Sequence, residues 1–342
     1  MKNYYVNVLG EILNRSDLGE YVVITTHRNA DPDALASSIV LYNFVNEILK
    51  KNVLVVFPEG VNEVSKKIVK EFNLHNLING PEVLLNTSIN SNFLLIIVDT
   101  SSTEQLGPIK NIVNRSNVII SIDHHVGGNI KDLADYAVLD TTARSTSEIV
   151  YKILSETYKF TYIDAMLLLA GIIYDTRRFM IATPSTLTIA SHLARVPGVD
   201  YRKVINLLQT EMDISERIAR LKAAQRLSFK RINDYIIAYS YVSAFEGSAA
   251  RALLDLGADI AVIGSENDEV RIVARAKPSI VKTLGISLGG EIMPLVGKYL
   301  KGSGGGHDAA GAACGKGDLF KALNYTVNLI VKKLHERLRG EN

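Results

Sequence analysis

The sequence predicts an α/β protein with two domains, in which a doubly wound parallel-sheet domain precedes a smaller mixed α/β domain. The chain has 342 residues, more than twice the length of a typical domain. Its first half alternates short apolar runs with longer segments of helical periodicity, and strand-like runs return after a charged middle region. The expected boundaries are a first domain over 1–184, a helical linker over 185–232 and a second domain over 233–342.

Four strands of the first domain are predicted from short runs that are apolar throughout and rich in β-branched residues, as strands buried on both faces of a parallel sheet are. These runs are YVVITT at 21–26, VLVVF at 53–57, FLLIIV at 93–98 and NVIISI at 117–122. Apolar residues three to four positions apart predict helices. These helices cover 33–51, 63–72, 145–158 and 163–174.

The second domain is predicted from a new set of strand-like runs. Strands are expected at 235–242, 260–265 and 270–276, with a helix over 249–257 that a glycine closes and a last amphipathic helix over 318–338. A glycine-rich element, GSGGGHDAAGAACG at 302–315, precedes that last helix. The segment 185–232 carries charged helical clusters, and we expect it to act as a hinge for domain closure.

The amino-acid composition excludes several kinds of binding site. With 47% hydrophobic and 22% charged residues and a net charge of +2, the chain has no bulk basic surface, so any nucleic-acid role needs a local site. Cys314 is the only cysteine, which excludes an intramolecular disulfide and a cysteine-based zinc site. The first residues lack signal-peptide features and no apolar run is long enough to span a bilayer, so we expect a cytoplasmic protein without membrane contact.

Ionisable residues cluster directly after the predicted strands. Parallel strands place their carboxyl ends at one edge of a sheet, where ligands bind. Three strands and one apolar helix deliver His27, Asp31, Asp33, Asp99, Asp123, His124 and Asp175 toward this edge. Each alone is more simply a helix cap, a turn residue or a packed histidine, and Asp33 could cap the helix that follows it.

Together these residues bring up to five negative charges to one edge, and close carboxylates repel one another strongly when poorly solvated. Bound divalent cations would neutralise them. Imidazole and carboxylate without thiolate suit manganese, with iron, cobalt or zinc as alternatives. Two ions about 3.5–4 Å apart, bridged by one carboxylate, would fit such a set of ligands.

The motifs HRNADPD, VDT, DHH and YDT, in this order, resemble the four motifs of the DHH phosphoesterase superfamily. The segment SGGGHDAAGA at 303–312 resembles the GGGH motif of its DHHA1 C-terminal domain. The resemblance implies an active site in the cleft between a DHH domain and a DHHA1 domain. It implies one ion on His27, Asp31 and Asp99, and a second on Asp33, Asp99, His124 and Asp175. It further implies that Asp123 supports its neighbours, that His125 faces the scissile phosphate and that His307 reaches the substrate.

Further substrate contacts are expected from the glycine-rich segment and from two arginines. GSGGG alone is typical of a flexible linker, but Gly304, Gly305 and Gly306 would also let backbone amides approach a phosphate, with His307 at the start of a helix. Arg275 resembles an arginine that the DHHA1 domain offers to the substrate, although a solvated strand charge is the alternative. Arg178 follows Arg177, which stands where the family often has glycine, and the pair could alter access or phosphate binding.

The function that the resemblance implies is Mn²⁺-dependent hydrolysis of phosphoester or phosphodiester bonds. Two domains without an added oligonucleotide-binding module favour short substrates. These would be short oligonucleotides, which are cleaved to nucleoside 5′-monophosphates, or pAp. The nucleophile would be a hydroxide activated by two metal ions. A cyclic-dinucleotide or pApA phosphodiesterase is a close alternative. A RecJ-type exonuclease would need stronger basic patches and aromatic platforms, and this chain has no tryptophan. A non-catalytic scaffold would require lost metal ligands. A homodimer is compatible with the family.

Overall fold

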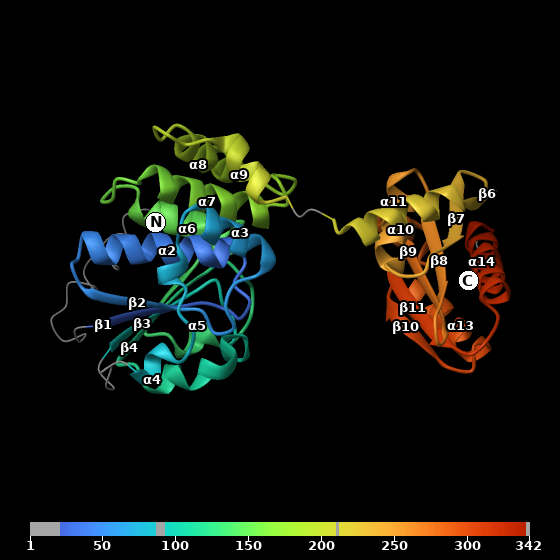
Figure 1. Cartoon of the computed structure of the whole chain (residues 1–342), viewed down its shortest axis with the longest axis horizontal. Helices are drawn as coiled ribbons and strands as arrows, with labels where there is room; N and C mark the ends of the chain where they lie inside the picture. The colour runs from blue at the N-terminus through green and yellow to red at the C-terminus, as the bar shows by residue number, and fades with distance from the viewer. Residues whose placement is uncertain (1–20, 87–92, 210–211, 340–342) are drawn as a thin grey trace. The chain divides into compact units, whose positions relative to one another are not determined.

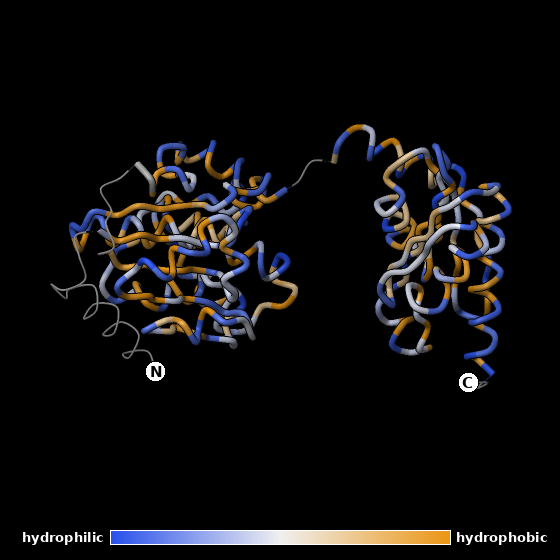
Figure 2. Tube along the Cα trace, turned by 90° about the horizontal axis from the view of Figure 1, so that it is seen from below, coloured by the Kyte–Doolittle hydropathy of each residue, from blue (hydrophilic) through white to orange (hydrophobic). Residues whose placement is uncertain are grey.

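The computed structural model describes residues 21–86, 93–209 and 212–339, so the expectation about the first residues of the chain lies outside the described part. The chain forms two compact units, Met1–Thr210 and Glu211–Asn342 (Figure 1). Each unit has its own apolar interior, with hydrophobic residues gathered along the strands and the inner sides of the helices (Figure 2). The predicted fold class, a parallel α/β domain followed by a smaller mixed one, is confirmed.

The segment predicted as a linker, 185–232, is instead divided between the units. Helices α8 (Pro184–Ala194) and α9 (Tyr201–Leu207) bury Leu193 and Val204 in the core of the first unit. Helix α10 (Ile214–Gln225) and strand β6 (Ser228–Ile232) belong to the second unit. The few apolar residues of α8 and α9 are enough to pack these helices against the first unit. Strand β6 was not predicted because it is a charged edge strand without the alternation of apolar and polar residues that is typical of strands.

The sheet of the first unit has the strand order β2-β1-β3-β4-β5, with every neighbouring pair parallel. Its strands are β1 (Tyr21–Thr25), β2 (Asn52–Val56), β3 (Phe93–Val98), β4 (Val118–Asp123) and β5 (Tyr136–Leu139). Four of these match the predicted runs. Sequence analysis missed β5, a four-residue edge strand that is only partly buried.

Helical layers cover both faces of this sheet, as the doubly wound prediction requires (Figure 1). One layer contains α2 (Pro32–Glu47), α3 (Glu63–Glu71), the short 3₁₀ turn η1 (His75–Leu77), α6 (Thr146–Leu154) and α7 (Tyr162–Asp175). The other contains α4 (Val83–Asn86), the 3₁₀ segment η2 (Thr103–Asn114) and α5 (Ile130–Leu133). Alternate strand residues serve the two layers: Ile24 packs with the first layer and Val23 with the second.

The second unit is built on a mixed sheet with the order β10-β11-β9-β8-β7-β6, in which β7 and β8 are parallel and the other pairs antiparallel. The remaining strands are β7 (Tyr235–Tyr241), β8 (Ile260–Glu266), β9 (Val270–Ala276), β10 (Ser303–His307) and β11 (Ala310–Gly315). The helical elements are α11 (Glu246–Asp255), α12 (Pro278–Leu284), the π-helical turn η3 (Leu288–Ile292), α13 (Met293–Tyr299) and α14 (Leu319–Leu338).

The glycine-rich segment forms the β10–β11 hairpin, so His307 ends a strand and does not begin a helix as expected. The cause is close backbone packing. A Cβ on Gly304 would lie 2.0 Å from the carbonyl oxygen of Met293, and one on Gly306 would lie 2.4 Å from that of Ala310. Only glycine allows the hairpin to press this closely onto α13, and this packing holds it in extended form.

No single helix in the described part of the chain is long and apolar enough to cross a membrane. The pair Pro278–Leu284 and Leu288–Tyr299 passes that test only when taken together, and the two helices are bent by 70° at the break between them.

Gly171 lets three helices of the first unit meet directly beneath the carboxyl edge of the sheet. A Cβ at this position of α7 would lie 2.2 Å from Ser147 Oγ on α6 and 2.8 Å from Asp33 Oδ1 on α2. It would also lie 3.0 Å from the Cα atom of Asp33, which cannot move as a flexible side chain can. This glycine therefore fixes the distance between the helices that carry the ionisable residues.

We expect Gly171→Ala to destabilise the protein by about 1–3 kcal/mol, because the added methyl group overpacks a closed contact. Gly247→Ala is the matched control, since its Cβ would meet Arg275 at 3.6 Å, an ordinary van der Waals distance. The measurement is the free energy of unfolding in denaturant. Equal stability of the two variants would contradict the close-packing argument.

Candidate metal centre

Asp99, directly after β3, lies at the centre of the ionisable cluster. Its side chain is 2% exposed, and its Oδ1 accepts a hydrogen bond of 2.8 Å from the Thr146 hydroxyl. Its backbone has a φ of +52°, a left-handed conformation that costs a non-glycine residue about 1–2 kcal/mol. The hydrogen bond from its N–H to the Ile122 carbonyl, 3.0 Å, holds this conformation at the sheet edge.

One group of ligand atoms lies on the Oδ2 side of Asp99. His27 Nε2 is 3.7 Å from Asp99 Oδ2 and 3.9 Å from Asp31 Oδ1. The donor atoms of His27, Asp31 and Asp99 all lie within 4.8 Å of one another. Asp31 is also the N-cap of α2, since its Oδ1 accepts the N–H groups of Asp33 and Ala34 at 3.0 and 3.1 Å. The residue that caps this helix is therefore Asp31 and not Asp33.

A second group lies on the Oδ1 side. His124 Nε2 is 3.5 Å from Asp99 Oδ1 and 3.2 Å from Asp175 Oδ2. The donor atoms of Asp33, His124 and Asp175 all lie within 4.8 Å of one another. Asp33 is fully buried, and its two oxygens accept N–H groups at the start of α6, from Thr146 at 2.6 Å and Ser147 at 2.8 Å. The partial positive charge of that helix end stabilises the buried carboxylate.

Asp123 organises the two histidines that follow it. Its Oδ1 accepts the backbone N–H of His124 at 2.8 Å and that of His125 at 3.2 Å, and it lies 2.8 Å from His125 Nδ1. The His125 ring is turned by these contacts, while its side chain stays 47% exposed. The acid of the triplet therefore holds the backbone at both histidines and the imidazole of His125.

In the absence of cations, the histidines and carboxylates of the cluster shift one another's pKa values. Burial disfavours the charged imidazole of His27, but Asp99 outweighs it and raises the pKa of His27 to about 9. Burial is likewise outweighed at His124, whose pKa the Asp175 and Asp99 carboxylates raise to about 11. Burial and the charge of Asp99 raise the pKa of Asp31 to about 6 and that of Asp33 well above its usual value. Although burial opposes it, the imidazoles of His124 and His27 lower the pKa of Asp99.

The residues present fit divalent cations. His124 Nε2 is buried and makes no hydrogen bond with the described residues, although carboxylate oxygens of Asp175 and Asp99 lie close to it. Leaving a buried nitrogen unpaired is costly, and a cation that shares these carboxylates would satisfy it. The donor set is imidazole and carboxylate only, which suits hard to borderline divalent metals.

The remaining predicted residues belong to the turn after α7 and to the second unit. Arg178 is exposed in the turn after α7, where Arg177, Arg178 and Phe179 all have positive φ. His307, Arg275 and the glycines at 304–306 lie in the second unit, so their place in an interdomain cleft stays a prediction. Sequence analysis missed the roles of Thr146 and Ser147 in holding Asp99 and Asp33. Their position at the start of a predicted helix was the available signal.

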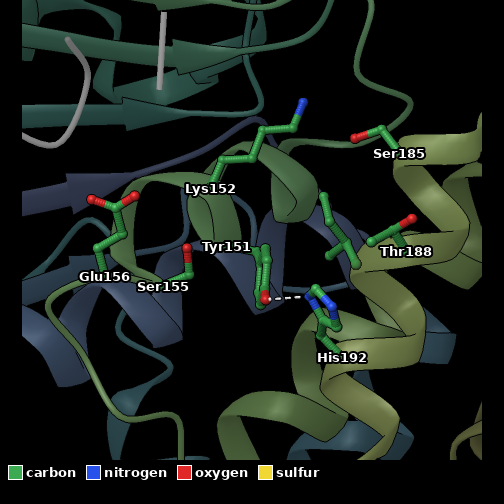
Figure 3. A pocket seen from close by; sticks show the side chains of 8 residues that line it. Tyr151, Lys152, Ser155, Glu156, Ser185, Thr188 and His192 are labelled. Atoms are coloured by element: carbon green, nitrogen blue, oxygen red, sulfur yellow. Dashed lines mark hydrogen bonds between the residues drawn. The ribbon is translucent and has the colours of Figure 1, made fainter. Parts of the chain in front are cut away.

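A cavity of about 490 Å³ lies elsewhere in the first unit, between α6 and α8 (Figure 3). Tyr151 Oη and His192 Nδ1 are hydrogen-bonded across it at 3.0 Å, and Lys152 pairs with Asp140 at 2.9 Å. None of the predicted site residues lines this cavity, and these polar groups already have partners. The cavity is therefore separate from the ionisable cluster around Asp99.

We expect divalent cation binding to release protons and to weaken as the pH falls from 9 to 6. Without cations, His27 and His124 stay protonated below pKa values of about 9 and 11, and a ligand nitrogen must lose its proton. Each released proton changes the affinity by up to about tenfold per pH unit. Calorimetry in buffers of different ionisation enthalpy measures the protons, and His27→Gln should release fewer. An affinity independent of pH would contradict this.

Known proteins have sequences similar to that of this chain. A sequence model of the DHH family, N-terminal domain, matches residues 21–172. An uncharacterized protein of Methanocaldococcus jannaschii is 30% identical over 94% of this chain and 94% of its own length. The cyclic-di-AMP phosphodiesterase GdpP of Bacillus subtilis is 29% identical over 87% of this chain, which spans only 45% of that protein.

Among solved structures, an exopolyphosphatase-related protein from Bacteroides fragilis has a similar fold. Its TM-score is 0.64 at 18% identity, and the alignment covers 98% of each chain. The matched residues 21–172 contain the segments that supply His27, Asp31, Asp33, Asp99, Asp123 and His124. The chain therefore belongs to the DHH family of phosphoesterases.

Proposed function

We propose that this protein hydrolyses phosphodiester bonds in short oligonucleotides, releasing nucleoside 5′-monophosphates, with two divalent ions, most simply Mn²⁺, as cofactors. The observation that carries the proposal is the position of Asp99 between the two groups of ligands. Its Oδ2 faces His27 and its Oδ1 faces His124, at 3.7 and 3.5 Å. A carboxylate with one oxygen toward each group is what a bridging ligand requires.

The residues that would hold the ions are His27, Asp31 and Asp99 on one side, and Asp33, His124 and Asp175 on the other. Asp99 would also serve the second side, since its Oδ1 lies 3.5 Å from His124 Nε2. Divalent cations held there would activate water as a nucleophile and neutralise charge on phosphoryl oxygens. The chain itself fixes the ligands before substrate arrives. Thr146 and the start of α6 hold Asp99 and Asp33, and the α2 backbone holds Asp31.

His125 is the residue we assign to the substrate phosphate. The hydrogen bond with Asp123 raises the pKa of His125, although burial opposes the shift. Because Nδ1 is held by Asp123, Nε2 is the nitrogen left to donate a hydrogen bond. Its N–H would stabilise a non-bridging oxygen or protonate the departing oxygen.

The choice of a short substrate rests on what the chain offers to nucleic acid. Its net charge is only +2 and it has no tryptophan, so a long strand would find neither a broad basic surface nor indole platforms. Short oligonucleotides and pAp need only local contacts. Arg275, His307 and the glycines at 304–306 are the contacts that we propose in the second unit.

A cyclic dinucleotide is the second candidate, and the similarity to GdpP of Bacillus subtilis favours it. The same cluster would serve for opening a cyclic phosphodiester, since the reacting bond is of the same type. The two candidates differ in whether the substrate must have a free chain end.

Manganese-dependent hydrolysis of four substrates tests the proposal: a 5′-labelled diadenylate, a 24-mer, pAp and cyclic di-AMP. We expect rapid turnover of the dinucleotide and slow turnover of the 24-mer. Asp99→Asn should reduce turnover by at least about a hundredfold, because it removes the charge that both ligand groups share. Asp132→Asn, an exposed aspartate, is the matched control. Turnover of cyclic di-AMP alone would favour the second candidate, and processive degradation of the 24-mer alone would sink both.

His125→Ala should separate turnover from metal binding. We expect kcat to fall by about 10²- to 10⁴-fold while the affinity for Mn²⁺ changes little, because Nδ1 of this residue is engaged with Asp123. His192→Ala, which removes a histidine that lines the α6–α8 cavity, is the matched control. Loss of Mn²⁺ binding in His125→Ala would show that this residue is a ligand.

A further inference from the structure

A further pocket of the first unit lies beside the candidate metal ligand Asp175. It is a cavity of about 260 Å³ at the carboxyl end of α7, and we call it the α7–α9 pocket. Its lining residues are Ile173, Tyr174, Arg177, Arg178 and Leu208. Two of them directly precede Asp175 in the chain and two follow it within three positions, so the pocket lies close to the ionisable cluster.

The charged groups of this pocket are all positive. Arg177 and Arg178 are exposed, and neither forms an ion pair with a carboxylate in the part of the chain that the structure describes. Lys67 adds a positive charge nearby, since its Nζ donates a hydrogen bond of 2.7 Å to the carbonyl of Gln209, the neighbour of Leu208. Such a set of cations favours an anionic ligand, and guanidinium groups match phosphate in a bidentate manner.

The backbone holds both arginines in a conformation that arginine does not favour. Arg177, Arg178 and Phe179 have φ values of +51°, +58° and +67°, in the left-handed region where a Cβ is crowded and glycine is the usual residue. The N–H of Arg178 donates to the Ile173 carbonyl at 2.7 Å, and that of Phe179 to the Thr176 hydroxyl at 3.0 Å, which fixes the turn. Glycine would relieve the strain at both arginines. A strained turn that keeps two guanidinium groups in a cavity indicates a binding role for these side chains.

Tyr174 lies between the pocket and the ionisable cluster. Its side chain lines the pocket and is 37% exposed, so a ligand can reach it. Burial and the charge of Asp31 raise the pKa of its hydroxyl, and the charge of Asp175 acts in the same direction. The hydroxyl is thus near candidate ligands of both groups. A molecule with one anionic group in the pocket can therefore place another at the cluster.

The pocket is suited to a terminal phosphate more than to an internal one. Ile173 and Leu208 are buried apolar residues, so the polar groups that the lining side chains offer are the two guanidinium groups and the Tyr174 hydroxyl. A phosphate monoester carries about 1.5 to 2 negative charges at neutral pH, whereas a phosphodiester carries a single charge. Paired guanidinium groups therefore favour the monoester.

We propose that the α7–α9 pocket binds a terminal phosphate monoester of the substrate through Arg177 and Arg178, while the phosphate that reacts lies at the ionisable cluster. This deepens the proposed function and rests on it, because it makes the preferred substrate a linear molecule with a phosphate at one chain end. The 5′-phosphorylated dinucleotide pApA meets this requirement, and so does pAp. The dinucleotide ApA lacks the terminal phosphate, and a cyclic dinucleotide has no chain end.

Equilibrium binding of diadenylates to the full chain in EDTA tests the proposal without catalysis. The probes are pApA, which has a terminal phosphate, and ApA, which has none. We expect pApA to bind at least about tenfold more tightly than ApA, as one further charge-assisted contact implies. Arg177→Gln/Arg178→Gln should remove this difference and leave the affinity for ApA unchanged. The charge-matched control is Arg115→Gln/Arg195→Gln, which changes two exposed arginines outside the pocket and should keep the wild-type preference.

Arg177→Gly/Arg178→Gly separates binding from folding. Its melting temperature should be no lower than that of the wild type, because glycine adopts a positive φ without strain. It should nevertheless lose the preference for pApA, because both guanidinium groups are gone. A wild-type preference for pApA in either double variant at Arg177 and Arg178 would overturn the proposal.

The two proposals fail in different ways, and cleavage of the same two probes in manganese distinguishes them. Cleavage of both, without any preference for pApA in binding, would leave the proposed function standing and remove the terminal-phosphate site. A preference for pApA that depends on Arg177 and Arg178, without cleavage of any substrate, would leave the pocket as a phosphate site and remove the proposed hydrolysis.

Discussion

The constraint on which the first unit depends is the gathering of carboxylates at one edge of its sheet. Asp31 and Asp99 lie in one group of candidate ligands and Asp33 and Asp175 in another, and two of these four carboxylates are almost fully buried. Such a group would drive the strand ends apart unless each charge had a fixed partner. The structure supplies three kinds of partner: the imidazoles of His27 and His124, the N–H groups at the start of α6, and the N–H groups of α2. Cations would complete this neutralisation, so the same contacts that stabilise the edge also prepare the site.

The two units differ in the groups that their packing holds in place. The first buries its ionisable groups, shifts their pKa values and holds them on the ends of rigid strands and helices. The second packs its glycine-rich hairpin against α13, where a Cβ on Gly304 would lie 2.0 Å from the carbonyl oxygen of Met293.

Membership of the DHH family indicates phosphoester hydrolysis, but it does not identify the substrate. The residues that supply the cluster lie within residues 21–172, which the family model matches, except Asp175, which follows directly after that range. The turn after Asp175 has an uncommon backbone conformation. Arg177, Arg178 and Phe179 have φ values of +51°, +58° and +67°, an unusual run for residues other than glycine. The buried Thr176 side chain stabilises the turn by accepting the N–H of Phe179 at 3.0 Å. Two exposed arginines are thereby held beside a candidate ligand.

The sequence by itself determined the elements whose signals are local. Apolar β-branched runs located four parallel strands, and the residues directly after them located the ionisable cluster, because a parallel sheet gathers its carboxyl ends on one edge. Tertiary structure decided what depends on packing between distant segments. It divided the segment 185–232 between the units and folded the glycine-rich segment into a hairpin. It also made Asp31 the N-cap of α2, while Asp33 accepts N–H groups at the start of α6. These outcomes depend on which backbones approach closely, as at Gly171 and Gly304, and short-range patterns of residue type do not contain those distances.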